Sequence, residues 1–248
     1  MFTLQDNAND SVYLSLVIPA FNEEARIAKS LDRILNFLRS QPYPAEVIIV
    51  DDGSCDQTVN VVRKIALGTD RLRILQSGAN YGKGWAIRSG MLEARGSYLF
   101  FTDADLSVPI EVLPLFVAKL VDGFDVTIGT RQKTGAFIEV HQPRYRELMG
   151  KTYTRLSNWI LGLQVSDFTC GFKGFRRAAA RELFFRQRLR RWSFDSEILY
   201  LARLKGYRVL EIPVTWRNDE ATKVRLWKDA ITSFLGLIQI RLHDFRGA

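Results

Sequence analysis

The fold is decided by residues 14–38, LSLVIPAFNEEARIAKSLDRILNFL, in which a strand pattern passes directly into a helix pattern. Residues 14–19 form a short, mostly apolar run, which is typical of a buried strand. Asn22 can then cap a helix, and Glu23 and Glu24 suit the positive end of that helix. Apolar residues recur behind them with helical period: Ile27, Leu31, Ile34, Leu35 and Leu38. This stretch therefore predicts a buried strand followed by an amphipathic helix.

The same alternation continues along the chain. It predicts strands over residues 46–50, 72–76, 98–102 and 125–129, with helices in most of the gaps. The second half is less regular and predicts a helix over 146–161, a turn or strand around 170–173, a helix over 194–204 and a strand over 208–214. Strands that alternate with helices indicate an α/β fold with a mostly parallel, Rossmann-like sheet. We predict one such domain over residues 1–222 and an amphipathic helical segment over residues 223–248.

The composition is that of a folded, basic protein. Apolar residues make up 47% and charged residues 25% of the 248 residues, which excludes a disordered chain and leaves enough apolar residues for one large core. The 35 basic residues outnumber the 27 acidic ones, and the net charge of +8 favours an anionic partner such as a nucleic acid, an anionic lipid or a phosphorylated metabolite.

Cysteine usage and hydropathy bear on the compartment. Cys55 and Cys170 are too few and too far apart for a disulfide framework or a thiolate zinc site, so we expect a reducing compartment. Residues 1–13 are polar and acidic, unlike a signal peptide, and no apolar run approaches the ~18 residues of a spanning helix. We therefore expect a chain that is not itself integral to a membrane.

Acidic residues follow two of the predicted strands. Asp103-Ala104-Asp105 comes after the strand over 98–102, Asp52 comes after the strand over 46–50, and Arg131 lies just beyond the strand over 125–129. Ligands of open α/β sheets bind beyond the carboxyl ends of the strands, so these residues are expected to line one crevice. Carboxylate pairs suit hard cations such as Mg²⁺ or Mn²⁺, and a chain with only two histidines has little material for a histidine-rich zinc or iron site. The alternative is that the aspartates only form turns.

Two further loops accompany these aspartates. In Asp51-Asp52-Gly53-Ser54, the Asp52 carboxylate can accept hydrogen bonds from a base or a ribose hydroxyl, and the alternative is a turn with a helix cap. The glycines of Asn80-Tyr81-Gly82-Lys83-Gly84 permit close backbone approach to a ligand. Ser77 and Gly84 occupy positions where a Walker motif needs glycine and serine or threonine, which disfavours an ATPase.

Taken together, four motifs in this order and spacing resemble family two glycosyltransferases: Val17-Ile-Pro-Ala-Phe-Asn-Glu-Glu24, Val50-Asp-Asp-Gly-Ser54, Asn80-Tyr-Gly-Lys-Gly84 and Asp103-Ala-Asp105. Later motifs resemble the polyprenyl-phosphate branch of that family, which comprises dolichyl-phosphate glucosyl- and mannosyltransferases: Cys170-Gly-Phe-Lys173, Phe194-Asp-Ser-Glu197 and Glu211-Ile-Pro-Val-Thr-Trp216 followed by Thr222-Lys223. The resemblance implies a single nucleotide-sugar-binding domain of the A-type glycosyltransferase fold. It also implies inverting transfer of a hexose from a nucleotide sugar to a polyprenyl phosphate at the cytoplasmic membrane face.

The resemblance implies roles for individual residues. The base and ribose would be surrounded by Pro19, Phe21, Glu23, Val50 and Asp52. The metal and the donor diphosphate would be held by Lys83, Asp103, Ala104 and Asp105, with Arg217 and Lys223 on the donor phosphates. Arg131 would lie between the donor and acceptor phosphates. Phe21 stands where tyrosine is usual, and Ser107 where mannosyl relatives often have glutamine, so donor choice or metal geometry can differ.

Other roles are assigned from the residues themselves. A phosphomonoester acceptor has a second pKa of about 6 and is already a dianionic nucleophile, so the enzyme needs cations rather than a catalytic base. We assign the acceptor phosphate to Arg131, Arg146 and Lys151, with solvated surface charge as the alternative. Glu197 begins the helix over 194–204 and can orient sugar hydroxyls or only stabilise the helix terminus. Asp105, Arg131 and Glu197 are the predicted catalytic residues.

The predicted function is a peripheral membrane hexosyltransferase that uses UDP-glucose and a polyprenyl phosphate. GDP-mannose as donor, a soluble polymer as acceptor and a non-catalytic nucleotide sensor are the alternatives. A nucleic-acid-binding module is disfavoured, because the cations are dispersed along the chain. The helix predicted in 223–243 places Val224, Trp227, Ile231, Phe234, Leu235 and Ile238 on one face, with Leu226, Leu237 and Ile240 widening it. It can lie on a membrane or pack on the domain or on another subunit.

Overall fold

The strand and the helix predicted from residues 14–38 are present as β1 (Leu14–Ala20) and α1 (Ile27–Arg39) in the computed structural model, which describes residues 12–219 and 226–244. All of the predicted apolar positions of α1 are buried. The predicted cap is wrong, because α1 begins only after Arg26 and Asn22 lies in the connecting loop. Asn22 adopts a left-handed φ of 53°, and its Oδ1 accepts the backbone N–H of Cys55 at 2.8 Å. The Asn22 side chain therefore connects two loops and does not cap the start of α1.

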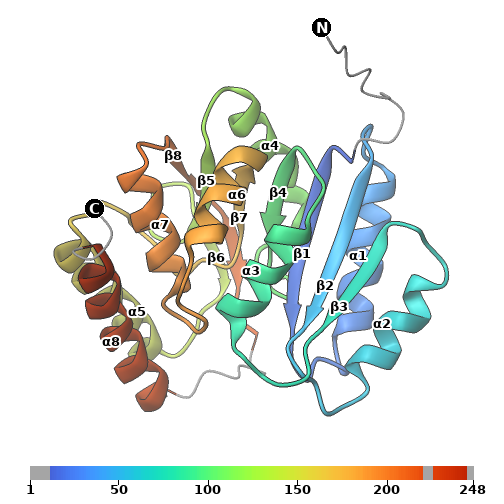
Figure 1. Ribbon diagram of the computed structural model, residues 1–248, viewed down its shortest axis with the longest axis horizontal. Helices are drawn as coiled ribbons and strands as arrows, with labels where there is room; N and C mark the ends of the chain where they lie inside the picture. Colours follow the sequence, from blue (N-terminus) through green and yellow to red (C-terminus); the bar gives the residue numbers. More distant parts are fainter. Residues whose placement is uncertain (1–11, 220–225, 245–248) are drawn as a thin grey trace, which may run out of the picture.

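The main sheet has seven strands in the order β3-β2-β1-β4-β7-β5-β8 (Figure 1). The strands besides β1 are β2 (Ala45–Asp51), β3 (Leu72–Gln76), β4 (Tyr98–Phe101), β5 (Val126–Thr130), β7 (Lys173–Arg176) and β8 (Val209–Pro213). Pairing is parallel except at β7, which lies antiparallel between β4 and β5. The predicted mostly parallel sheet is confirmed, and the segment around 170–173 leads into a strand.

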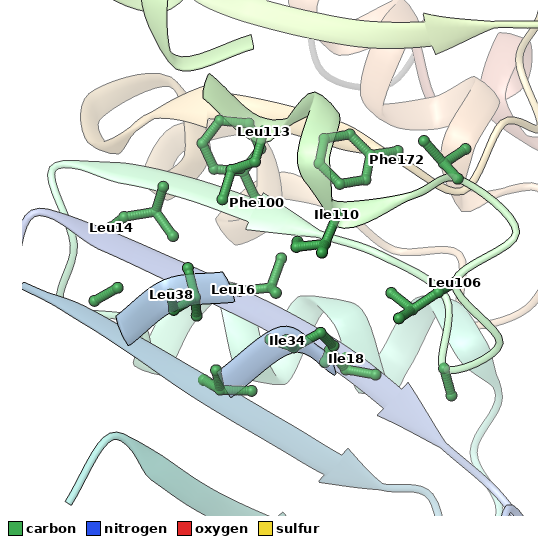
Figure 2. Close-up of a cluster of buried hydrophobic side chains, with 14 of the residues drawn as sticks. Leu14, Leu16, Ile18, Ile34, Leu38, Phe100, Leu106, Ile110, Leu113 and Phe172 are labelled. Carbon is green, nitrogen blue, oxygen red and sulfur yellow. The ribbon is translucent and has the colours of Figure 1, made fainter. Parts of the chain in front are cut away.

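Helices cover both faces of this sheet. One face is covered by α1, α2 (Thr58–Ala66), the short 3₁₀ helix η1 (Ile110–Val112) and α4 (Leu113–Val121), and the other by α3 (Lys83–Glu93), α6 (Arg177–Arg186) and α7 (Phe194–Leu204). Side chains alternate along β1, so that Leu16 and Ile18 enter the first core whereas Val17 enters the second. Figure 2 shows Leu16 and Ile18 beside Ile34 and Leu38 of α1.

Two further strands and two helices lie outside the main sheet. The strands β6 (Phe137–Val140) and β9 (Thr215–Arg217) form a two-stranded parallel sheet, which the sequence did not predict. Helix α5 (Arg144–Leu161) packs beside α8 (Leu226–Asp244), where Leu161 and Tyr200 meet Leu237 and Ile240 (Figure 1). The predicted C-terminal helix is confirmed, whereas the predicted boundary between residues 222 and 223 lies outside the described residues. Within 12–219 and 226–244, no helix has both the length and the apolar character needed to cross a bilayer.

Candidate active site

The parallel strands bring the loops that follow β1, β2 and β4 to one edge of the sheet, because these three strands are direct neighbours. Asp103 follows β4 there, and the Nζ atom of Lys83, the first residue of α3, lies 2.6 Å from its Oδ1. Burial alone would lower the pKa of Lys83, but the carboxylates of Asp103 and Asp195 hold it above its usual value. Lys83 is therefore a charged partner of the acidic motif, Asp103-Ala104-Asp105.

Asp105 is the second carboxylate of this motif. Its Oδ1 accepts the backbone N–H of Ser107 at 2.9 Å, and its Oδ2 lies 4.0 Å from Nη1 of Arg26. Burial and the charge of Asp103 both raise the pKa of Asp105. Two carboxylates that repel each other in this way create a site that a divalent cation would relieve.

The donor atoms near Asp103 and Asp105 limit how a metal ion could be bound. The described residues contain no group of three or more histidine, cysteine or acidic side chains that could hold a metal ion. A metal ion at this edge would therefore have at most Asp103 and Asp105 as acidic ligands from the motif, and its other ligands would be diphosphate oxygens and water. Magnesium-type cations are commonly bound in this way, through one or two carboxylates and the substrate phosphates.

The backbone of Gly171 packs against the acidic pair. A Cβ atom at this position would lie 2.0 Å from Oδ2 of Asp103, which is closer than any real contact. Gly171 belongs to the loop that precedes β7, so the reversed strand brings its own loop to the same edge of the sheet.

Arg131, directly after β5, is a cation of the site that several partners hold in place. Its Nε and Nη2 donate to the carboxylate of Asp167 at 2.7 and 2.9 Å, and Nη2 also donates to Thr169 at 2.8 Å. The guanidinium lies over the ring of Trp216, 5.1 Å from its centroid. Burial alone would lower the pKa of Arg131, but the charges of Asp167 and Asp103 hold it above its usual value. Arg131 is thus fixed on three sides and is electrostatically coupled to the acidic pair.

A basic cavity of about 490 Å³ lies beyond β9 and is lined by His141, Gln142, Pro143, Arg144, Arg146 and Asn218. The residue before Asn218, Arg217, donates its backbone N–H to the carbonyl oxygen of Ser107. Ser107 in turn donates its backbone N–H to the Asp105 carboxylate. The predicted acceptor residue Arg146 lies in this cavity, and its buried Nε has no hydrogen-bond partner among the described residues. Lys151 is exposed further along α5.

Asp52 and Glu197 each accept two backbone N–H groups and thereby build loops. The Asp52 carboxylate binds the N–H groups of Tyr81 and Gly82 at 2.8 and 2.7 Å. The Glu197 carboxylate binds those of Arg188 and Leu189 at 3.0 and 2.8 Å. Among the described residues no hydrogen bond or ion pair joins Glu197 to Asp105 or Arg131, and its catalytic role stays a prediction.

The other predicted donor residues are distributed as follows. Pro19 and Phe21 are half-buried at the end of β1, and Val50 and Ala104 are buried. Glu23 is buried and its carboxylate binds Arg26. Arg217 is exposed on β9, and Lys223 lies outside the described residues.

Sequence reasoning missed two charged residues of the site. Asp167, the partner of Arg131, lies 36 positions further along the chain, so no local pattern predicts the pair. Arg26 follows Glu23 by three positions, and this spacing of opposite charges was a usable signal.

Comparison with known proteins gives a consistent result. The model of glycosyl transferase family 2 matches residues 15–184. A dolichyl-phosphate beta-glucosyltransferase of Trichomonas vaginalis, ALG5A, is 35% identical in an alignment that covers 96% of this chain and 76% of the relative. The dolichyl-phosphate beta-glucosyltransferase of Saccharomyces cerevisiae is 34% identical over 94% of this chain and 75% of its own.

Solved structures are similar in fold. Glucosyl-3-phosphoglycerate synthase from Mycobacterium tuberculosis, in complex with Mn²⁺, UDP and glucosyl-3-phosphoglycerate, superposes with a TM-score of 0.69 at 21% identity, covering 92% of this chain and 80% of that one. At this identity the likeness concerns the fold alone. The family resemblance inferred from the four sequence motifs is confirmed by the family model and by the dolichyl-phosphate relatives.

Proposed function

The chain belongs to glycosyl transferase family 2, and from that premise we propose that it transfers glucose from UDP-glucose to a dolichyl-type polyprenyl phosphate at the cytoplasmic face of a membrane. The carrying observation is that Asp103 and Asp105 share one sheet edge with the ordered cation Arg131. Such a site can hold two phosphorylated substrates against their mutual repulsion. The names of the relatives that cover most of this chain support the choice of glucose and dolichyl phosphate.

In this proposal the acidic residues bind the metal ion. Asp103 and Asp105 would hold a Mg²⁺ or Mn²⁺ ion, which when bound offsets the charge that develops on the departing diphosphate. A solved neighbour of the same fold that was crystallised with Mn²⁺ and UDP supports the choice of a divalent cation. Lys83 keeps Asp103 in place through its ion pair and adds a positive charge beside the diphosphate.

Arg131 would orient the acceptor. Asp167, Thr169 and Trp216 fix its guanidinium, and Nη1 has no hydrogen-bond acceptor among residues 12–219 and 226–244. That nitrogen can bind a phosphate oxygen with little loss of side-chain entropy, because the fork is already ordered. The acceptor phosphate has a pKa of about 6 and attacks as a dianion, so the site needs no proton acceptor. A single direct displacement of this kind inverts the configuration of the sugar.

A donor panel tests this function. We expect transfer from UDP-glucose to dolichyl phosphate with a kcat/KM at least about tenfold above that with GDP-mannose, because a site built to hydrogen-bond one base and sugar leaves polar groups unpaired with another. Radiolabelled product should partition into organic solvent, since only a lipid-linked sugar does so.

Any other outcome would indicate a different function. Preference for GDP-mannose would make the protein a mannosyltransferase. Product that stays in the aqueous phase would indicate a soluble acceptor, and donor binding without turnover would indicate a nucleotide sensor.

We also propose that α8 rests on the membrane surface. The face with Leu237 and Ile240 is buried against α5 and α7, whereas Ile231, Phe234, Leu235, Ile238 and Leu242 are exposed at helical spacing. Trp159 of the neighbouring α5 is 82% exposed and can join this surface. An apolar stripe of this kind, exposed on a surface helix, suits the interface of a bilayer.

The test is vesicle sedimentation with the double variant Leu235→Ser/Ile238→Ser. We expect its partition onto phosphatidylcholine–phosphatidylserine vesicles to fall by at least about tenfold, because two apolar side chains no longer enter the interface. Leu67→Ser, at a 90% exposed position after α2, is the matched control and should leave partition unchanged. Equal partition of the double variant and the unchanged chain would exclude α8 as the contact.

A further inference from the structure

Arg26 is the residue that connects the loop after β1 with the acidic motif. Its guanidinium binds the Glu23 carboxylate through Nε and Nη2, and Nη1 lies 2.7 Å from Oδ2 of Asp219. The same Nη1 lies 4.0 Å from Oδ2 of Asp105. Burial alone would lower the pKa of Arg26, but these carboxylates hold it above its usual value. Arg26 is therefore held at the edge of the proposed metal site, paired with Glu23 and Asp219 and within ion-pair distance of Asp105.

The loop that carries Arg26 is itself anchored. The backbone N–H of Glu23 donates to Oγ1 of Thr58 at 2.7 Å, and that of Asn22 donates to Oγ of Ser54 at 2.8 Å. The Arg26 side chain is only 22% exposed. It cannot swing freely into solvent, so its charge acts on the acidic motif whether or not a ligand is present.

Each carboxylate of the motif thus has a cation of the chain beside it. Nζ of Lys83 lies 2.6 Å from Oδ1 of Asp103, and Nη1 of Arg26 lies 4.0 Å from Oδ2 of Asp105. A bare divalent cation approaching the pair meets two positive side chains, which weakens its attraction to the carboxylates. A nucleoside diphosphate such as UDP carries more negative charge than the cation carries positive charge, and the diphosphate of a nucleotide sugar carries as much. Neither complex with the metal is therefore repelled by these side chains as the bare cation is.

We propose that Arg26 is a positioning residue that acts as the internal counter-ion of Asp105 and makes metal binding depend on a bound nucleoside diphosphate. The inference rests on the proposed function, in that Asp103 and Asp105 receive the metal of a nucleotide-sugar donor. It adds that the metal and the diphosphate enter together. By linkage, the factor by which UDP tightens Mn²⁺ equals the factor by which Mn²⁺ tightens UDP, so the dependence can be measured from either side.

The experiment measures Mn²⁺ binding by electron paramagnetic resonance of the free ion, and UDP binding by calorimetry with and without Mn²⁺. In Arg26→Gln we expect Mn²⁺ alone to bind about tenfold more tightly than in the unchanged chain, and the UDP-dependent tightening to shrink by about the same factor. Arg26→Met should behave in the same way, so the result does not depend on the folding of one variant. Binding of Mn²⁺ to UDP in solution is measured separately and subtracted.

Two controls separate charge from structure. Arg26→Lys keeps the positive charge but not the planar guanidinium. The factor by which UDP tightens Mn²⁺ binding should stay within about threefold of its value in the unchanged chain. Arg33→Met removes a cation of α1 that pairs with Glu111 at an exposed position, and should change nothing. Unchanged Mn²⁺ affinity and coupling in both neutral variants would overturn the inference and leave the proposed function intact. Failure of the unchanged chain to bind UDP with Mn²⁺ would overturn both.

Discussion

Replacing Asp105 with asparagine is expected to lower hexosyl transfer by about a hundredfold to a thousandfold while the chain stays folded. The substitution removes a charge from the proposed metal site but keeps the side-chain volume. The amide oxygen of the new side chain can still accept the N–H of Ser107, which Asp105 accepts at 2.9 Å. Burial and the charge of Asp103 raise the pKa of Asp105, so the protein gains little stability from that carboxylate and loses little without it.

The measurement compares steady-state transfer and urea unfolding for the variant and the unchanged chain. Asp122→Asn, at an exposed position that pairs with Lys119, is the matched control and should retain full activity. Chelation by EDTA should abolish transfer by the unchanged chain and cause no further loss in the Asp105→Asn variant. Full-speed transfer by a folded Asp105→Asn variant would mean that the site operates without this carboxylate.

Lys173→Met is expected to lower the free energy of unfolding by about 3–5 kcal/mol, because it leaves a buried carboxylate without its partner. Lys173 is fully buried on β7, and its Nζ lies 2.5 Å from Oδ1 of Asp195. The same nitrogen donates to the carbonyls of Phe168 and Cys170 at 2.9 and 2.7 Å. These carbonyls belong to the loop that carries Asp167 and Gly171, so the variant also loosens the support of Arg131 and Asp103.

Urea unfolding at pH 7 measures this loss. The double variant Lys173→Met/Asp195→Asn should recover about half of the lost stability, because the second change removes the uncompensated charge. Lys119→Met breaks an exposed ion pair by the same substitution and should cost less than about 1 kcal/mol. A loss at Lys173 no larger than that at Lys119 would show that the buried pair is not needed for stability.

Much of the fold was predictable because its signals are local. The strands β1 to β5 and helix α1 follow from apolar runs and helical spacing, and parallel neighbours then bring Asp103 and Lys83 to one edge. The segment of β7 was predicted only as a turn or strand around 170–173, because the strand is short and contains a lysine whose ionic partner, Asp195, lies 22 positions away in the sequence. The strands β6 and β9 escaped detection because their burial is partial and lacks a regular alternation.

In the site, too, only the residues placed by local signals were predictable. Residues placed by a strand end, such as Asp105 and Arg131, could be named from the sequence. Residues placed by pairing across the chain could not, and Asp167 with Arg131 is the clearest case. Asn22 shows the reverse error, since it has a plausible local role as a helix cap and instead binds the backbone of Cys55, 33 positions away.

The antiparallel position of β7 has a consequence for synthesis on the ribosome. Because β7 separates β4 from β5, a growing chain that ends before it cannot join those two strands into one sheet. The region around Asp103 can take shape early, whereas Arg131 receives its anchor only once Asp167 has emerged. A nascent chain would therefore fold the half that carries Asp103 first and would anchor Arg131 only late in translation.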